Sequence, residues 1–207
     1  MFKINIYAKL FFIAKVFVIT LILGMKVYGE NGETEKKMIA IGSSNAVGKI
    51  KIFSSFTCPH CASFHFDVLP EIKKKYIDKG KVQLIFIDFP LDQAAFNASK
   101  LLHCVDKNRQ INFMDVIYEK QNQWTAGSTI EEINESLKKI VKSLGISSTQ
   151  FDSCLVDGGI SDKILSGRIE AHQTYTINST PTIVINEKKL EGSATFKNIK
   201  KRIEKII

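Results

Sequence analysis

The chain of 207 residues has no block of charge of one sign. Its 29 Lys and Arg residues outnumber its 21 Asp and Glu residues, and the formal net charge is +8. Four of the lysines lie in residues 1–29, which contain no acid, and the others are scattered through segments with a helical pattern. Nucleic-acid-binding proteins cluster basic and aromatic residues. The scattered lysines therefore indicate a solvated surface, and we expect no nucleic-acid partner.

The N-terminus lacks an uncharged apolar run long enough to span a membrane. The run from Val16 to Met25 has ten residues, whereas a span needs about 20. A basic start, a short apolar stretch and small residues before position 30 predict a secretory signal peptide over residues 1–29. An uncleaved anchor over residues 10–25, with Lys15 tolerated, is the alternative. In both cases we expect the rest of the chain to lie outside the cytoplasm, where disulfides persist.

Cysteine is scarce, with four residues that all follow the predicted signal peptide. Cys58 and Cys61 are three positions apart, which favours their pairing and leaves Cys104 with Cys154. Two buried free thiols are the alternative for the second pair. A zinc site built from all four cysteines is a competing interpretation, but the second close ligand pair that such sites use is absent. We therefore expect no metal.

No internal repeat or low-complexity tract interrupts the exported part. Residues 30–48 predict a polar lead-in with one edge strand at 38–41. An alternating pattern over 49–53, a helical pattern after Pro59 and a continuous apolar run over 82–89 predict a strand, a helix and a buried strand. This order suggests a parallel pair of strands with a right-handed crossover.

The middle of the chain, residues 92–175, has a helical pattern throughout. Capping boxes are predicted at Ser128–Glu131 and Ser147–Gln150. The predicted helices cover 92–106, 110–123, 129–144, 148–156 and 161–175. Strands at 182–185 and 188–190 then flank a hairpin turn at Asn186-Glu187, and 195–207 forms an amphipathic helix. The fold class is therefore α/β, with a unit made of residues 49–91 and 176–207 that is split by an inserted helical domain, 92–175.

The chemistry is expected at Cys58-Pro59-His60-Cys61. Proline is tolerated at the first helical position, so Cys58 is expected to cap the helix. Its sulfur then faces free backbone N–H groups and the positive end of the helix dipole, and His60 adds a positive charge or a donor. These features favour the thiolate, which is the nucleophile in disulfide exchange. Cys58 is the expected attacking sulfur and Cys61 the resolving one, with no cofactor beyond their own disulfide.

The string Phe53-Ser-Ser-Phe-Thr-Cys58-Pro59-His60-Cys61 resembles the active-site segment of the DsbA family of bacterial periplasmic disulfide oxidases. The resemblance covers nearly all of residues 48–207 and is to the alphaproteobacterial branch of the family. Further segments that carry it are Phe64-His65, Val68-Leu69-Pro70, Asp88-Phe89-Pro90-Leu91-Asp92, Leu102-His-Cys104, Phe151-Asp-Ser-Cys154-Leu155 and Asn178-Ser179-Thr180-Pro181-Thr182.

The resemblance implies a thioredoxin fold with an inserted helical domain. It implies a cis bond between Thr180 and Pro181, where the backbone of this loop positions a client peptide beside the reactive sulfur. It also implies a second, non-catalytic disulfide between Cys104 and Cys154. The implied partners are reduced, unfolded exported proteins and a DsbB-type, quinone-linked membrane protein that reoxidises a monomeric enzyme.

Two positions depart from the best-known DsbA proteins. His65 stands where those proteins have glutamate, and Thr180 stands where they often have valine. Threonine also occurs there in related disulfide isomerases, so an isomerase or reductase is the main alternative, although residues 30–48 are too few for a dimerisation domain. A non-catalytic zinc-binding or disulfide-stapled adaptor is the rival from another class. Trp124 is expected to pack in the core, and Phe56 either packs there or lines a client groove.

Overall fold

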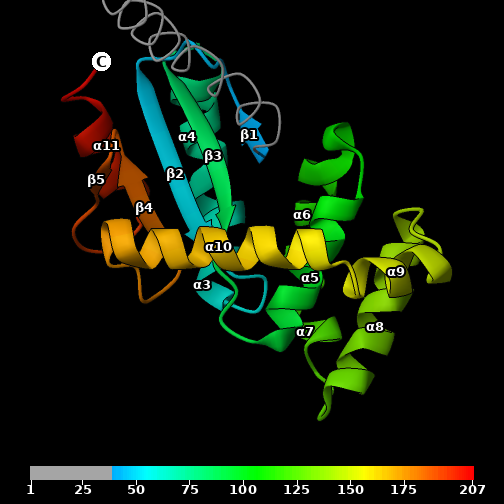
Figure 1. Ribbon diagram of the computed structural model, residues 1–207. Helices are drawn as coiled ribbons and strands as arrows, with labels where there is room; N and C mark the ends of the chain where they lie inside the picture. The colour runs from blue at the N-terminus through cyan, green and yellow to red at the C-terminus, as the bar shows by residue number, and fades with distance from the viewer. Residues whose placement is uncertain (1–38) are drawn as a thin grey trace, which may run out of the picture. The chain divides into compact units, whose positions relative to one another are not determined.

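The computed structural model describes residues 39–207. The predicted signal peptide and the start of the lead-in lie outside these residues. A five-stranded sheet has the order β1-β3-β2-β4-β5, visible in Figure 1. The strands are β1 (Ile39–Ile41), β2 (Gly48–Ser54), β3 (Val82–Asp88), β4 (Thr182–Ile185) and β5 (Lys188–Lys189).

Among the strands of residues 39–207, only β2 and β3 run parallel, in register from Gly48 opposite Val82 to Ser54 opposite Asp88. The strands β1 and β4 lie antiparallel to β3 and β2, and β5 forms the hairpin with β4. Asn186 and Glu187 have φ angles of 44° and 62°, as the predicted two-residue hairpin turn requires. The predicted parallel pair of strands and the predicted hairpin are therefore confirmed.

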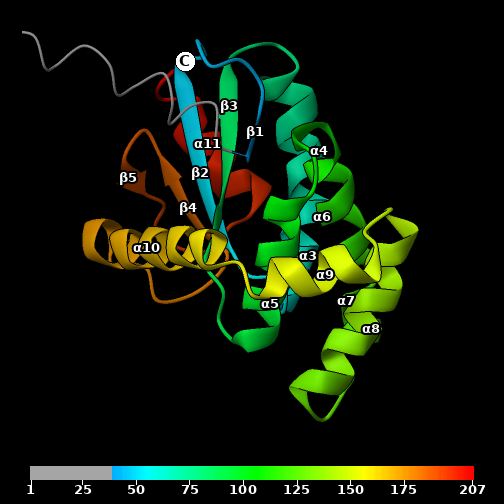
Figure 2. The same cartoon turned by 45° about the vertical axis from the view of Figure 1, so that its right-hand side comes forward.

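Side chains alternate between the two faces of the sheet, as a period of two requires. Ile50 and Ile52 of β2 point into the larger core, where Ile72 and Ile199 also lie. Phe53 points to the opposite face and packs in a separate cluster with Ala171 and Ile177. The crossover helix and α11 (Phe196–Ile203) thus cover one face, while α10 (Gly158–Tyr175) crosses the other (Figure 2).

The crossover helix is less regular than its sequence pattern predicts. It consists of α3 (Pro59–Ser63), a π-helical segment (Phe64–Val68), α4 (Leu69–Ile72) and a second π-helical segment (Lys73–Ile77). Pro70 has no N–H and would clash with the carbonyl four residues before it in a regular α-helix. The first π segment is therefore found where the helix accommodates this proline. Gly80 follows the helix with a φ of +67°.

The remaining helices lie between β3 and β4. They are α5 (Gln93–Cys104), α6 (Gln110–Glu119), α7 (Gln121–Trp124), α8 (Ile130–Ser143), α9 (Ser148–Leu155) and α10, with a 3-10 turn at Lys107–Arg109. Within residues 39–207 no helix has the length and apolar character needed to cross a membrane.

Several helix boundaries differ from the predictions. The last helix, predicted over 195–207, ends at Ile203. The helix predicted over 110–123 breaks at Lys120, whose φ and ψ are −95° and 15°. The helix predicted from 161 begins at Gly158, because Asp157 caps it by accepting a hydrogen bond from the Ile160 N–H at 2.8 Å. The first capping box is shifted by one residue, since Thr129 is the cap and its hydroxyl accepts from the Glu132 N–H.

Candidate functional site

Cys58 lies just beyond the C-terminal end of β2 and caps α3, with Pro59 at the first helical position. Its φ and ψ of −80° and 116° are extended, as is usual for a residue that precedes a helix. The carbonyl of Cys58 accepts the Cys61 N–H at 3.0 Å, so the first turn holds the two cysteines together. Both are thiols, and they are 7% and 2% exposed. Cys58 is therefore the more accessible sulfur.

The surroundings of Cys58 stabilise its thiolate. The hydrogen bond from the Cys61 thiol contributes most, and further donors lower the pKa of Cys58 from 9.0 to about 5 despite its burial. These donors are the Thr180 hydroxyl and the backbone N–H groups of Cys61 and His60. The interaction with Cys58, together with burial, raises the pKa of Cys61 far above that of an ordinary thiol. Cys58 is therefore the sulfur that is ionised near neutral pH.

His60 contributes through its backbone. Its N–H is among the groups that lower the Cys58 pKa, whereas its side chain is exposed. The peptide group of His60 contributes because the helix start points its N–H groups at the capping sulfur.

The loop before β4 lies against Cys58. The Thr180–Pro181 bond is cis, and the Cys58 thiol donates a hydrogen bond to the Thr180 carbonyl at 3.3 Å. Among the described residues, the buried Thr180 hydroxyl has no hydrogen-bond partner while Cys58 is a thiol. Since this hydroxyl also lowers the Cys58 pKa, it is a donor for the thiolate.

Gln121 of α7 joins the active-site loop to the helical region. Its buried amide Nε2 donates to the carbonyls of Phe56 at 2.7 Å and of Cys58 at 3.1 Å. The sequence reasoning missed this residue. A signal for it was present in the sequence. Phe113, Ile117 and Gln121 are spaced four residues apart, and the first two are buried, so the polar Gln121 falls on a buried helix face.

Three of the side chains singled out from the sequence prove to pack in the core. Phe56 is 3% exposed, with its ring centroid 5.0 Å from that of Tyr118, so it packs in the core. Trp124 is fully buried and its indole N–H donates to the Ile117 carbonyl at 2.9 Å. His65 is buried, and its Nε2 lies 2.6 Å from Oδ1 of Asp115 in α6.

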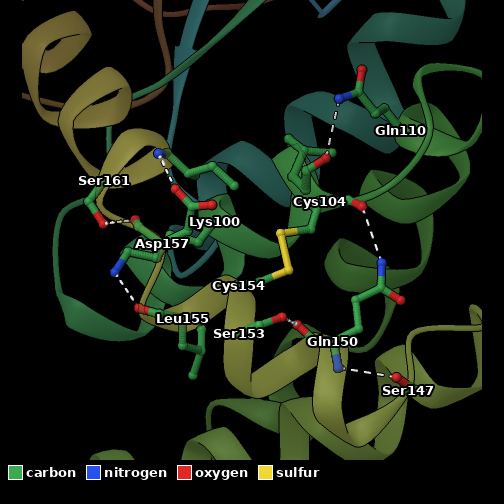
Figure 3. The surroundings of a disulfide bond; sticks show 12 residues. Lys100, Cys104, Gln110, Ser147, Gln150, Ser153, Cys154, Leu155, Asp157 and Ser161 are labelled. Carbon is green, nitrogen blue, oxygen red and sulfur yellow. Dashed lines mark hydrogen bonds between the residues drawn. A yellow bond between two sulfur atoms is a disulfide. The ribbon is translucent and has the colours of Figure 1, made fainter.

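A disulfide joins Cys104 at the end of α5 to Cys154 in α9, with a Cα–Cα distance of 6.3 Å (Figure 3). Beside it the buried Lys100 donates to the Leu155 carbonyl at 2.7 Å. With their sulfurs bonded to each other, these two cysteines cannot complete a zinc site with Cys58 and Cys61. In the part of the chain that the structure describes, no three His, Cys, Asp or Glu side chains are grouped as metal ligands would be.

A largely apolar groove of about 430 Å³ runs beside the reactive sulfur. Its lining includes His60 and Phe64 from one side and Thr180, Pro181 and Phe196 from the other. It therefore lies where a peptide could reach Cys58 along the cis-proline loop.

Comparison with known proteins places these features in a family. Residues 33–205 match a family model described as thioredoxin. The chain is 31% identical over 170 residues to a probable disulfide bond formation protein D of Bacillus cereus, covering 80% of this chain and 77% of that protein. It is 27% identical to a putative protein-disulfide oxidoreductase of Rickettsia bellii, covering 84% of this chain and 65% of that protein. The chain thus spans less than two thirds of that relative's length.

Solved structures agree with the sequence relatives. The crystal structure of Wolbachia pipientis alpha-DsbA1 is similar, with a TM-score of 0.73 and 29% identity, and the match covers 82% of this chain and 90% of that one. BdbD from Bacillus subtilis, in its oxidised form, has a TM-score of 0.69 and 26% identity, with 82% and 92% covered. The predicted fold class and the resemblance are confirmed: the chain belongs to the thioredoxin family and is a relative of the DsbA-type proteins within it.

Proposed function

We propose that this protein is a dithiol oxidase that introduces disulfide bonds into exported proteins. The observation that carries the proposal is the environment of Cys58, whose pKa of about 5 makes its thiolate a stable leaving group at neutral pH. A stabilised thiolate favours the reduced form of the protein and so makes its disulfide a stronger oxidant. Relatives named as protein-disulfide oxidoreductases support the same chemistry.

In the proposed reaction the enzyme begins with a Cys58–Cys61 disulfide. A client thiolate attacks Sγ of Cys58, and Cys61 leaves with the bonding electron pair and takes up a proton, as its high pKa requires. A second client thiolate then attacks the client sulfur of the mixed disulfide, and Cys58 leaves as a thiolate. Two electrons pass from the client dithiol to the protein, and no cofactor other than the cysteine pair takes part.

The protein must be reoxidised after each turnover. We assign this step to a DsbB-type, quinone-linked membrane partner, on the basis of the DsbA resemblance. The sequence pattern of residues 1–29 supports export to the periplasm, and we propose that a monomer acts there. Thr180 and Pro181 are the proposed residues that position the client.

The test is stoichiometric oxidation of a reduced peptide with two cysteines by the oxidised protein. We expect one client disulfide per Cys58–Cys61 disulfide consumed. Neither Cys58→Ser nor Cys61→Ser should oxidise the peptide, because neither variant can hold this disulfide. The Cys104→Ala/Cys154→Ala variant is the control and should oxidise the peptide with the same stoichiometry. A protein that exchanges no disulfide with the peptide would refute the proposal.

An isomerase is the second candidate, because Thr180 occupies the position next to the cis proline at which related isomerases also have threonine. The two activities separate in an assay on a client with scrambled disulfides. Faster recovery of the native client with reduced protein than with oxidised protein would favour the isomerase.

A further inference from the structure

The positive charge of the protein is concentrated in one part of the described chain. Residues 186–207 contain seven Lys and Arg and three Glu, whereas residues 39–185 contain 16 basic and 15 acidic residues. The sequence alone suggested scattered lysines, because the basic residues of this segment come from a strand and a helix that are separated along the chain. Folding gathers them on one surface.

This surface is a groove of about 480 Å³, here called the basic groove, between β5 and α11. Its cationic lining residues are Lys188, Lys189, Lys201, Arg202 and Lys205, and Glu191 is the acid among its lining residues. Lys188, Lys201 and Lys205 are exposed. Across residues 39–207, no carboxylate forms an ion pair with any of these three.

The basic groove is continuous with the proposed client site. A second groove, of about 290 Å³, shares Lys189 and Leu190 with it. This second groove in turn shares Pro181 and Ala194 with the apolar groove beside Cys58. One path therefore leads from the cis-proline loop along the β4–β5 edge to the lysines of α11.

We propose that the basic groove binds an acidic stretch of the client polypeptide while the client cysteine reacts with Cys58. This inference rests on the proposed function and names its substrate class: exported proteins with Asp or Glu residues near a reducible cysteine. The path runs along β4, whose four residues span about 13 Å at 3.3 Å per residue. An extended client therefore presents its carboxylates about four or more residues from the reacting cysteine.

Lysines on an edge strand have a simpler use, which is to prevent pairing with other chains. That use accounts for Lys188 and Lys189 on β5, the edge of the sheet. It does not account for Lys201 and Lys205 on the neighbouring helical segment, which line the same groove. The two explanations predict different effects of charge reversal.

The experiment measures the second-order rate of oxidation of two reduced peptides that differ only in a distal segment, acidic in one and neutral in the other. The protein variants are Lys201→Glu/Lys205→Glu and a matched control, Lys139→Glu/Lys142→Glu, whose lysines are exposed on α8. Exposed ion pairs each change an interaction by up to about fivefold. We expect the groove variant to oxidise the acidic peptide about five- to tenfold more slowly and the neutral peptide at an unchanged rate.

The control should keep the preference for the acidic peptide, and added salt should reduce that preference in the wild-type protein. The proposal would be overturned if the wild-type protein oxidised both peptides at equal rates. It would also be overturned if the control variant lost as much rate on the acidic peptide as the groove variant does. Two other results would also overturn it. In one, the groove variant aggregates more than the wild-type protein but oxidises both peptides at the wild-type rates. In the other, the wild-type protein binds phosphatidylglycerol vesicles through these lysines and has no preference between the peptides. If neither peptide is oxidised, the proposed function fails. Binding of a labelled, cysteine-free acidic peptide then tests the groove alone.

Discussion

The low pKa of Cys58 depends most on the neighbouring thiol, so removing that thiol should raise it. The Cys61 side chain is the largest contributor to the lowering from 9.0 to about 5. A hydrogen bond to a charged group contributes about 1.5–3 kcal/mol, and one pKa unit corresponds to about 1.36 kcal/mol. In Cys61→Ala we therefore expect the pKa of Cys58 to rise by about one to two units. It should stay below 9.0, because the Thr180 hydroxyl and the backbone donors remain.

The assay is the ultraviolet absorbance of the thiolate in the reduced protein as a function of pH. Cys58→Ala should abolish the transition near pH 5, which assigns it to this residue. Cys61→Ser keeps an O–H donor at the same place and should shift the transition less than Cys61→Ala. A wild-type transition near pH 9, or an unchanged transition in Cys61→Ala, would refute the reasoning.

The same pKa sets the pH dependence of the reduction potential. Because the pKa of Cys58 is lowered, its ionisation stabilises the reduced state above pH 5, and this stabilisation is lost as the pH falls through 5. At pH 7, two units above the pKa, it amounts to about 2.7 kcal/mol, or about 60 mV for two electrons. The reduction potential, measured against glutathione, should fall by about 30 mV per pH unit above pH 5, because only Cys61 takes up a proton on reduction there. Below pH 5 both sulfurs take up a proton, and the potential should fall by about 59 mV per pH unit. A slope near 59 mV throughout would mean that Cys58 is an ordinary thiol.

Three further predictions concern stability, measured by urea unfolding. The Cys104→Ala/Cys154→Ala variant should lose about 4 kcal/mol of unfolding free energy, because the disulfide closes a loop between residues 50 apart; an unchanged midpoint would contradict this. Gln121→Leu should lose about 1–3 kcal/mol, because two buried carbonyls lose their donor, whereas Gln121→Glu at a pH where the carboxyl is protonated should recover part of the loss. Lys100→Met should lower the free energy of unfolding by about 1–3 kcal/mol, because it leaves the Leu155 carbonyl unpaired. A variant more stable than the wild-type protein would show that the cost of burying the amine exceeds the gain from this hydrogen bond.

Much of the fold follows from local patterns. The alternation over 49–53, the apolar run over 82–89 and the turn residues Asn186 and Glu187 predicted their elements because strand burial and turn geometry are properties of neighbouring residues. The role of Cys58 as a helix cap was predictable for the same reason, since Pro59 directly follows it. Two of the boundaries that were wrong lie at Lys120 and Gly158. The helix breaks at Lys120, where the hydrophobic pattern continues. The helix predicted from 161 starts at Gly158 because the adjacent Asp157 caps it, a local signal that the apolar periodicity does not include.

The surroundings of the reactive sulfur were decided by tertiary structure. The Thr180 carbonyl accepts a hydrogen bond from the Cys58 thiol across 122 positions of the chain, and Gln121 donates to the Cys58 carbonyl from 63 positions away. His65 finds its partner Asp115 on a different helix, 50 residues along the chain. No sequence period relates these residues, so only the packing of the helical segment and the β4 loop against α3 brings them together.

By itself the sequence determined the redox centre and the order of strands and helices, because each depends on residues that lie close together along the chain. The tertiary structure decided what surrounds that centre: the buried donors that set the acidity of Cys58, and the grooves that lead away from it. The lysines of β5 and α11 illustrate the difference. Their spacing along the chain indicated a dispersed surface charge, and the packing of the helix beside the hairpin places them in one groove.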